Sequence, residues 1–208
     1  MTAPLDLFDP GKNSILDAPD YPSFRERLRN SACDRCALAR GRTTIVVDRG
    51  NFNSKVVLIG EAPGENEDHE GKAFVGRAGK LLDRLLLELG FDTNRDALIM
   101  NVVKCRPPEN RAPKPDEAAA CSDFFRKQLS LLDARIVILM GATALRHTLK
   151  HKKDFSMKEE VGKFFEDDAF PDAKVMVIFH PAYILRDPRK EPLMRAHLAR
   201  LVTLWKTL

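Results

Sequence analysis

The chain has 208 residues, of which 44% are hydrophobic and 31% charged, and its formal net charge at neutral pH is +4. This composition is that of an ordinary globular protein and excludes a low-complexity or repeat protein, while so small a charge does not by itself indicate a polyanionic partner. No apolar run approaches the roughly 20 residues that span a bilayer, and the first 20 residues carry four aspartates where a signal peptide would be basic and then apolar. We therefore expect a cytoplasmic protein with no membrane partner.

The N-terminal residues differ from the rest of the chain. Residues 1–30 are polar and contain four prolines, and only residues 24–28 indicate a short helix. We interpret residues 1–30 as an arm or linker. Residues 31–208 have the size of one compact domain.

Apolar segments rich in Val, Ile and Leu alternate with helical patterns after residue 40. A leucine face predicts a helix that ends at Gly90, Pro115 is placed to open a second, a third follows Gly141, and residues 192–205 form the last. The segments predicted to be strands are 44–47, 55–59, 97–103, 135–140 and 174–179. This alternation predicts an α/β fold, a three-layer α/β/α sandwich around a mostly parallel central sheet of four to five strands.

Polar or unusual residues follow four of these predicted strands. Open parallel sheets bind ligands in the crevice at the carboxyl ends of their strands. We therefore expect residues 61–64, residues 101–105, Gly141 and the pair His180-Pro181 to meet at one cleft.

The four cysteines have a spacing that suggests a metal centre. Cys33 and Cys36 form a C-x2-C pair, and Cys105 and Cys121 bracket a proline-rich loop. Structural disulfides are rare inside cells, so four thiolates around zinc or around an iron–sulfur cluster are the better interpretations. The spacing alone does not choose between these metals, and slightly favours zinc. Without a metal, Cys105 would end a strand, Cys121 would be a buried helix residue, and the C-x2-C pair would be incidental.

The second predicted strand leads into a glycine-punctuated acidic loop, residues 60–68. Its carboxylates would repel a phosphate, and the lysine and serine or threonine that end a P-loop are absent. The loop is therefore either a solvated surface feature or, as we prefer, a group of carboxylates that can activate water.

These motifs together resemble the family 4 uracil-DNA glycosylases. The resemblance covers most of the chain from Cys33 onward, in the family's order. It implies that Cys33, Cys36, Cys105 and Cys121 ligate a [4Fe-4S] cluster rather than zinc. The segments that carry it are GEAPGENED, FVG-x-AGKLLD, NVVKCRPPENRAPKPDE and HPAYILR. The covalent family X enzymes carry a nucleophilic histidine after the third strand, and this chain has no histidine there.

The resemblance implies that uracil is extruded from single- or double-stranded DNA, and that its N-glycosidic bond is hydrolysed to leave an abasic site in base-excision repair. Asn101 would read the Watson–Crick edge, because uracil and cytosine exchange a donor for an acceptor there, and Phe74 would stack on the ring. His180 would donate to uracil O2. Glu61, Ala62, Pro63 and Glu67 would complete the uracil pocket, and one of the carboxylates Glu61, Glu67 and Asp68 would hold the attacking water.

DNA binding also needs phosphate contacts and a wedge that fills the gap in the duplex. Leu185 is the candidate wedge, because apolar side chains can intercalate between base steps. The candidate DNA-binding residues are Arg106, Arg111, Lys114, Leu185 and Arg186, and Lys104 belongs to the same set of basic residues near the predicted cleft. Helix packing for Leu185 and a solvated basic surface for the others are the plain alternatives.

Two other functions remain open on the sequence. One is a non-catalytic, metal-stabilised nucleic-acid-binding module that kept the fold, and the other is a magnesium-dependent nucleotide hydrolase that uses the acidic loop. We favour the glycosylase, acting as a monomer, because Phe74, Asn101 and His180 are all present.

Overall fold

The computed structural model describes residues 15–149, 151–152 and 154–208. Five-residue strands such as β2 (Val56–Gly60) and β4 (Ile136–Met140) are buried on both faces, as their unbroken β-branched and apolar sequences require. The remaining strands are β1 (Asp48–Gly50), β3 (Leu98–Asn101), β5 (Phe164–Phe165) and β6 (Lys174–Ile178). They form one sheet in the order β1-β3-β2-β4-β6-β5.

The central strands are parallel, and the two edge strands run the other way. Strands β3, β2, β4 and β6 pair in parallel, so their carboxyl ends lie at one edge of the sheet. Strand β1 is antiparallel to β3, and β5 is antiparallel to β6. The register pairs Gly60 at the end of β2 with Asn101 at the end of β3.

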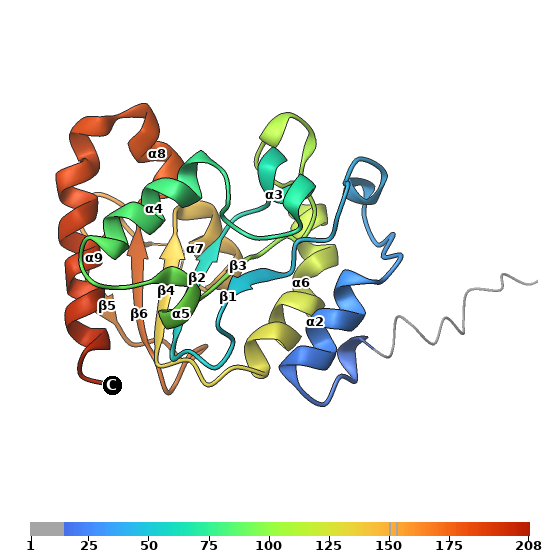
Figure 1. Ribbon diagram of the computed structural model, residues 1–208, viewed down its shortest axis with the longest axis horizontal. Helices are drawn as coiled ribbons and strands as arrows, with labels where there is room; N and C mark the ends of the chain where they lie inside the picture. The colour runs from blue at the N-terminus through green and yellow to red at the C-terminus, as the bar shows by residue number, and fades with distance from the viewer. Residues whose placement is uncertain (1–14, 150, 153) are drawn as a thin grey trace, which may run out of the picture.

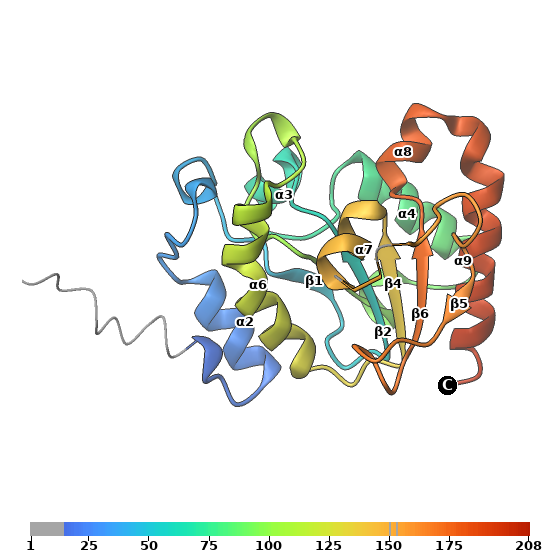
Figure 2. The same ribbon diagram turned by 180° about the vertical axis from the view of Figure 1, so that it is seen from behind.

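Helices cover both faces of the sheet, as Figures 1 and 2 show. On one face, α4 (Arg77–Leu87), α8 (Pro181–Arg186) and α9 (Glu191–Trp205) bury a core that includes Leu58, Ile138 and all the leucines of α4 except Leu87. On the other face, α2 (Tyr21–Arg29), α6 (Pro115–Ser130) and α7 (Ala142–Thr148) cover alternate residues of the same strands, such as Ile59 and Leu139.

Short helices complete the described chain. They are η1 (Ala37–Arg40), α3 (Glu65–Glu70), α5 (Thr93–Asp96), η2 (Pro108–Asn110) and η3 (Pro188–Lys190). In the part of the chain that the structure describes, none of the helices combines the length and apolar character needed to cross a bilayer.

The predicted three-layer α/β/α sandwich is confirmed, with three differences in detail. The sheet has six strands rather than four to five, because the two-residue β5 was too short to recognise in the sequence. The first strand was placed too early at 44–47, since β1 begins at Asp48, where the pairing with β3 starts. Residues 65–70, predicted as loop, form α3, whose first turn carries the acidic residues that a helix N-terminus favours.

The predicted N-terminal arm lies partly outside the described residues. Residues 15–30 include α2, which begins after Asp20, whose carboxylate accepts a hydrogen bond from the Ser23 N–H at 2.8 Å. Phe24 and Leu28 of this helix are fully buried in the same core as the face of the sheet that α6 covers. The boundary at residue 30 remains a prediction, but α2 packs as part of the domain.

Candidate active site

A pocket of about 490 Å³ lies at the carboxyl end of the parallel strands, which is within the range of small-molecule sites. Segments that follow three of the four parallel strands meet there. The sequence predicted four such segments, but Gly141, which follows β4, does not line the pocket. The predicted site residues among its lining are Glu61, Ala62, Pro63, Glu67, Phe74, Asn101, Arg111, His180, Leu185 and Arg186.

Asn101 is the most informative side chain in this pocket. It is 1% exposed, and neither its Oδ1 nor its Nδ2 has a hydrogen-bond partner among the described residues. Buried polar atoms are almost always paired, because leaving one unpaired costs about 1–3 kcal/mol. An unpaired carbonyl and amide side by side therefore indicate a ligand with a complementary donor and acceptor.

Phe74 is fixed beside Asn101 by a strained backbone. Its φ angle is +55°, a conformation that non-glycine residues rarely adopt, and its ring is 5% exposed. A Cβ atom at Gly60 would lie 2.5 Å from both Asn101 Oδ1 and the Phe74 ring. Only glycine at position 60 lets the amide and the aromatic face come this close, so the pair can hold a flat polar ring.

His180 is a neutral hydrogen-bond donor in this site. It caps the N-terminus of α8, where its Nδ1 accepts a hydrogen bond from the Ala182 N–H at 3.1 Å. The proton of the neutral ring therefore lies on Nε2. Burial, with a smaller contribution from the charge of Arg186, lowers the pKa of His180 to about 4. Its ring lies 5.6 Å from the Phe74 ring, centroid to centroid.

The lowered pKa of His180 should make the stability of the protein depend on pH. Between about 6.5, the ordinary value, and about 4, the unfolded chain binds more protons than the folded protein. The free energy of unfolding should therefore fall as the pH is lowered through this window, and His180→Gln should remove that part of the fall. Denaturant titrations of both proteins at several pH values measure it, and an identical pH dependence in both would contradict the assignment.

The three candidate carboxylates differ in what they contact. Glu67 accepts hydrogen bonds from the N–H groups of Gly64 at 3.1 Å and Gly76 at 2.7 Å, so it ties together two glycine turns of the pocket wall. Asp68 is 1% exposed, does not line the pocket, and accepts hydrogen bonds from the Thr43 and Thr44 N–H groups. Glu61 lines the pocket, and its carboxylate makes no hydrogen bond or ion pair with any described residue. It is the carboxylate best placed to take a water molecule.

The basic loop before α6 is braced by one buried acid. Arg111 donates to both carboxylate oxygens of Glu117, at 2.8 and 2.6 Å, and Glu117 also accepts from the Lys114 N–H. The Arg111 guanidinium lowers the pKa of Glu117, which is 1% exposed. Arg106 does not line the pocket, but it contacts Glu65 and Asn110, which do. Arg106 and Arg111 thus shape the loop, whereas the Lys114 side chain is exposed.

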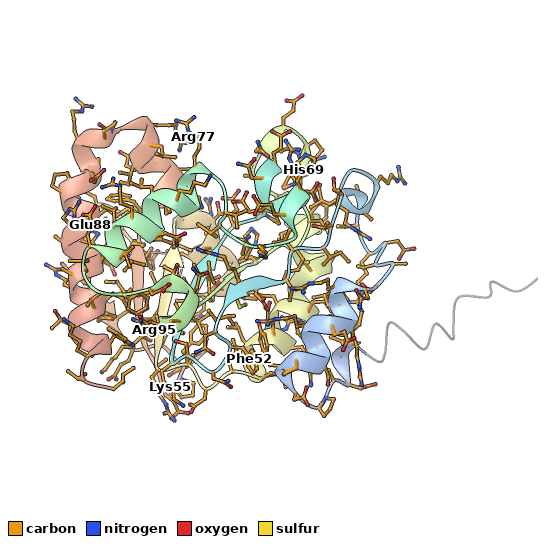
Figure 3. The ribbon with its side chains drawn as sticks, in the orientation of Figure 1. Phe52, Lys55, His69, Arg77, Glu88 and Arg95 are labelled. Atoms are coloured by element: carbon orange, nitrogen blue, oxygen red, sulfur yellow. The ribbon has the colours of Figure 1, made fainter. Side chains whose placement is uncertain are left out.

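The helix α8 brings Leu185 and Arg186 to the pocket. Leu185 is half-buried and Arg186 is exposed. Figure 3 shows Arg77, at the start of α4, at the same end of the molecule as α8, while Lys55 and Arg95 lie at the opposite end. Exposed cations and an apolar side chain therefore gather at the end of the molecule that carries the pocket.

One residue of the predicted basic set is not at the surface at all. Lys104 is 1% exposed, and its Nζ donates to the main-chain oxygen of Asn101 at 2.7 Å. The idea that Lys104 anchors a phosphate is therefore wrong. Its position among basic residues of the sequence suggested a surface residue, and only the fold brings its side chain against Val47, Asn101 and Gln128.

The four cysteines line a single cavity, which adjoins the basic loop before α6. All four are free thiols, and Cys105 and Cys121 are buried. Burial, with the adjacent Cys121, raises the pKa of Cys105 to about 12, and burial raises the pKa of Cys121. The charges of Arg42 and Lys104, which also line the cavity, partly oppose this effect of burial.

The donor set of this cavity fits an iron–sulfur cluster. Among residues 15–149, 151–152 and 154–208, no group of three or more His, Cys, Asp or Glu side chains is arranged to hold a metal ion. The usual protein ligands of an iron–sulfur cluster are four cysteine thiolates. Cys33, Cys36, Cys105 and Cys121 supply that set.

Asn110 lines the pocket and Gly60 lies against two pocket residues, Asn101 and Phe74, yet neither was assigned a role from the sequence. The role of Gly60 depends on its register with Asn101, which appears only once β2 and β3 are paired. Asn110 has a φ angle of +55° and accepts from Arg106 through its side chain. The proline-rich composition around Asn110 was a signal for a special turn.

Comparison with known proteins shows which family this chain belongs to. The family model of the uracil DNA glycosylase superfamily matches residues 47–206, which include every residue that lines the pocket. The type-4 uracil-DNA glycosylase of Thermotoga maritima is 42% identical over 166 residues, which cover 80% of this chain and 83% of that protein. That of Saccharolobus solfataricus is 41% identical, covering 75% and 74%, and that of Archaeoglobus fulgidus is 37% identical, covering 76% and 80%.

Proposed function

Because this chain belongs to the uracil DNA glycosylase superfamily, and within it to the type-4 uracil-DNA glycosylases, we propose that it hydrolyses the N-glycosidic bond of uracil in DNA, in the pocket at the carboxyl end of its sheet. The observation that carries this proposal is the unpaired, buried amide of Asn101. Uracil offers N3–H and O4 on one edge, which complement the Oδ1 and Nδ2 of Asn101.

Recognition requires that the base leave the DNA stack. An extruded uracil would stack on Phe74 and pair with Asn101, and Gly60 would leave room for both contacts. Cytosine presents a donor where uracil presents O4 and an acceptor where uracil presents N3–H, so it would leave both Asn101 atoms badly matched. Discrimination of this kind comes from the cost of unpaired buried polar groups.

Bond cleavage needs charge stabilisation on the base and a nucleophile at the sugar. The Nε2–H of neutral His180 would donate to uracil O2 as the electron pair of the breaking C1′–N1 bond moves onto the base. The Glu61 carboxylate would stabilise the positive charge that develops on the sugar and hold a water molecule that forms the new bond to C1′. The water would give a proton to this carboxylate, and the departing uracil anion would take up a proton from solvent. The products are free uracil and an abasic site.

We also propose that Cys33, Cys36, Cys105 and Cys121 hold a [4Fe-4S] cluster. When bound, it would supply bonds that tie the segment after α2 to both ends of the proline-rich loop. That loop brings Asn110 and Arg111 into the pocket lining and carries Arg106, which contacts Asn110. The role of the cluster is thus structural, and catalysis rests on the side chains of the pocket.

The proposed activity is tested by incubating the protein with uracil-containing single- and double-stranded oligonucleotides in the presence of EDTA. Abasic product under these conditions is the expected result. Binding without product would support a non-catalytic nucleic-acid-binding module, and product that depends on added magnesium would support a nucleotide hydrolase.

Leu185 is expected to matter more for double-stranded than for single-stranded DNA. A wedge offsets the cost of unpairing and unstacking a base, which an unpaired strand does not incur to the same extent. Leu185→Ala should therefore lower uracil excision from a duplex about 10-fold more than from a single strand. Leu87→Ala, which truncates a leucine that is 65% exposed on α4, is the matched control. Equal losses on both substrates would mean that Leu185 serves helix packing.

A further inference from the structure

A buried polar network lies beneath the pocket, centred on Lys104. The ammonium of Lys104 has three N–H donors and three acceptors within reach. It donates to the main-chain oxygens of Asn101 at 2.7 Å and Val47 at 3.4 Å, and to Gln128 Oε1. Every donor of this ammonium is therefore used inside the protein, and none is left for DNA.

The network continues from Gln128 to the N-terminal helix α2. Gln128 Nε2 donates to the hydroxyl of Tyr21 at 2.6 Å, and this hydroxyl donates to Asp48 Oδ2 at 2.7 Å. Arg25 closes the chain with an ion pair to Asp48 at 2.9 Å. Lys104, Gln128, Asp48 and Tyr21 are each no more than 3% exposed. A buried network in which each member is held by the next favours one arrangement of its side chains.

The polar contacts of Asn101 show why the buried network matters for the pocket. Its side-chain amide has no hydrogen bond within the described protein, so nothing polar fixes the direction of the amide before a base arrives. Asn101 is also the last residue of β3, where the sheet ends. Its main-chain oxygen is held by Lys104, and its side chain is confined sterically by Gly60 and Phe74.

We propose that Lys104 is a positioning residue for uracil recognition, which orients Asn101 by holding the main-chain oxygen of that residue. This inference rests on the proposed role of Asn101 in reading uracil. It gives Lys104 a function through Asn101 and not through DNA phosphates. Because Lys104 directly precedes Cys105, it also couples the cysteine-bearing loop to the base-reading residue.

The proposal is tested by a double-mutant cycle between Lys104→Met and Asn101→Ala, measured as single-turnover uracil excision with enzyme in excess. Methionine keeps the length of the side chain and removes its donors. Lys104→Met should lower the rate of the otherwise native protein about 10- to 100-fold, because a small misplacement of a recognition group is costly. In the Asn101→Ala background the same change should cost no more than roughly twofold, since the group that it positions is already absent.

Two further measurements separate positioning from simple loss of stability. Free uracil should inhibit the Lys104→Met protein more weakly, while the KM for DNA should change by less than about twofold, because a buried ammonium makes no phosphate contact. Phe91→Leu, a core change at a fully buried residue that packs on Trp205, is the control, and it should lower the melting temperature without a change in uracil inhibition.

Lys104→Gln keeps a donor and serves in the same cycle if Lys104→Met does not fold. An equal fold-loss in both backgrounds would overturn the proposal and leave Lys104 a purely structural residue. An unchanged rate in Lys104→Met would overturn it as well. If the unmutated protein releases no uracil, the proposed function itself fails, so the two failures are distinguishable.

Discussion

Replacement of Asn101 by alanine is expected to lower kcat/KM for uracil excision about 100- to 1000-fold, which is the usual effect of removing one stabilising hydrogen-bond group from an active site. The same change should leave the melting temperature unchanged or raise it. Both polar atoms of Asn101 are buried without a partner in the described protein, so alanine removes groups whose desolvation is uncompensated. Opposite effects on activity and stability are the signature of a residue retained for its ligand.

Asn66→Ala is the matched control for this experiment, because Asn66 also lines the pocket but is exposed on α3. Asn66→Ala should change neither kcat/KM for uracil excision nor the melting temperature appreciably. Steady-state excision from a uracil-containing single strand and a thermal melt of each protein provide the comparison. A destabilised Asn101→Ala protein with near-normal activity would show that Asn101 is a structural residue.

Cys105→Ala is expected to have the largest effect on stability. If the four cysteines ligate a [4Fe-4S] cluster, the purified native protein should be brown with about four irons per chain, and Cys105→Ala should lose most of this iron. The melting temperature should fall by roughly 10 °C or more, because cofactor binding free energy contributes to folding and each kcal/mol shifts a domain of this size by about 2–4 °C.

Iron analysis, visible absorption and thermal melts of the native, Cys105→Ala and Ser122→Ala proteins measure this effect. Ser122 neighbours Cys121 on α6 but does not line the cysteine cavity, so Ser122→Ala should keep the iron and the stability. Colourless native protein with one zinc would refute the cluster. A Cys105→Ala protein as stable as the native one would refute a structural metal altogether.

Much of the fold could be predicted because its signals are local. The leucine face of α4 and the unbroken apolar strands need only the periodicity of one segment. Strand β5 has two residues and no such period, and the acidic residues of α3 resembled a solvated loop. Short elements like these are stabilised by their neighbours, so their own sequence carries little signal.

The candidate site also has features that could be predicted from the sequence and features that could not. Asn101, His180 and Phe74 were predicted from motif order, and all three line one pocket. The sequence did not separate Glu61 from Glu67 and Asp68, because the choice depends on which main-chain N–H groups each carboxylate meets.

The sequence by itself determined the α/β architecture, the edge of the sheet where the site lies, and the residue types that the chemistry needs. The tertiary structure decided what surrounds each of those side chains. It buried Lys104 against the main-chain oxygen of Asn101 instead of leaving it at the surface. It also brought the Asn101 amide and the Phe74 ring so close to Gly60 that a side chain there would collide with both. Burial and pairing are properties of contacts between distant segments, and those contacts exist only when the sheet has formed.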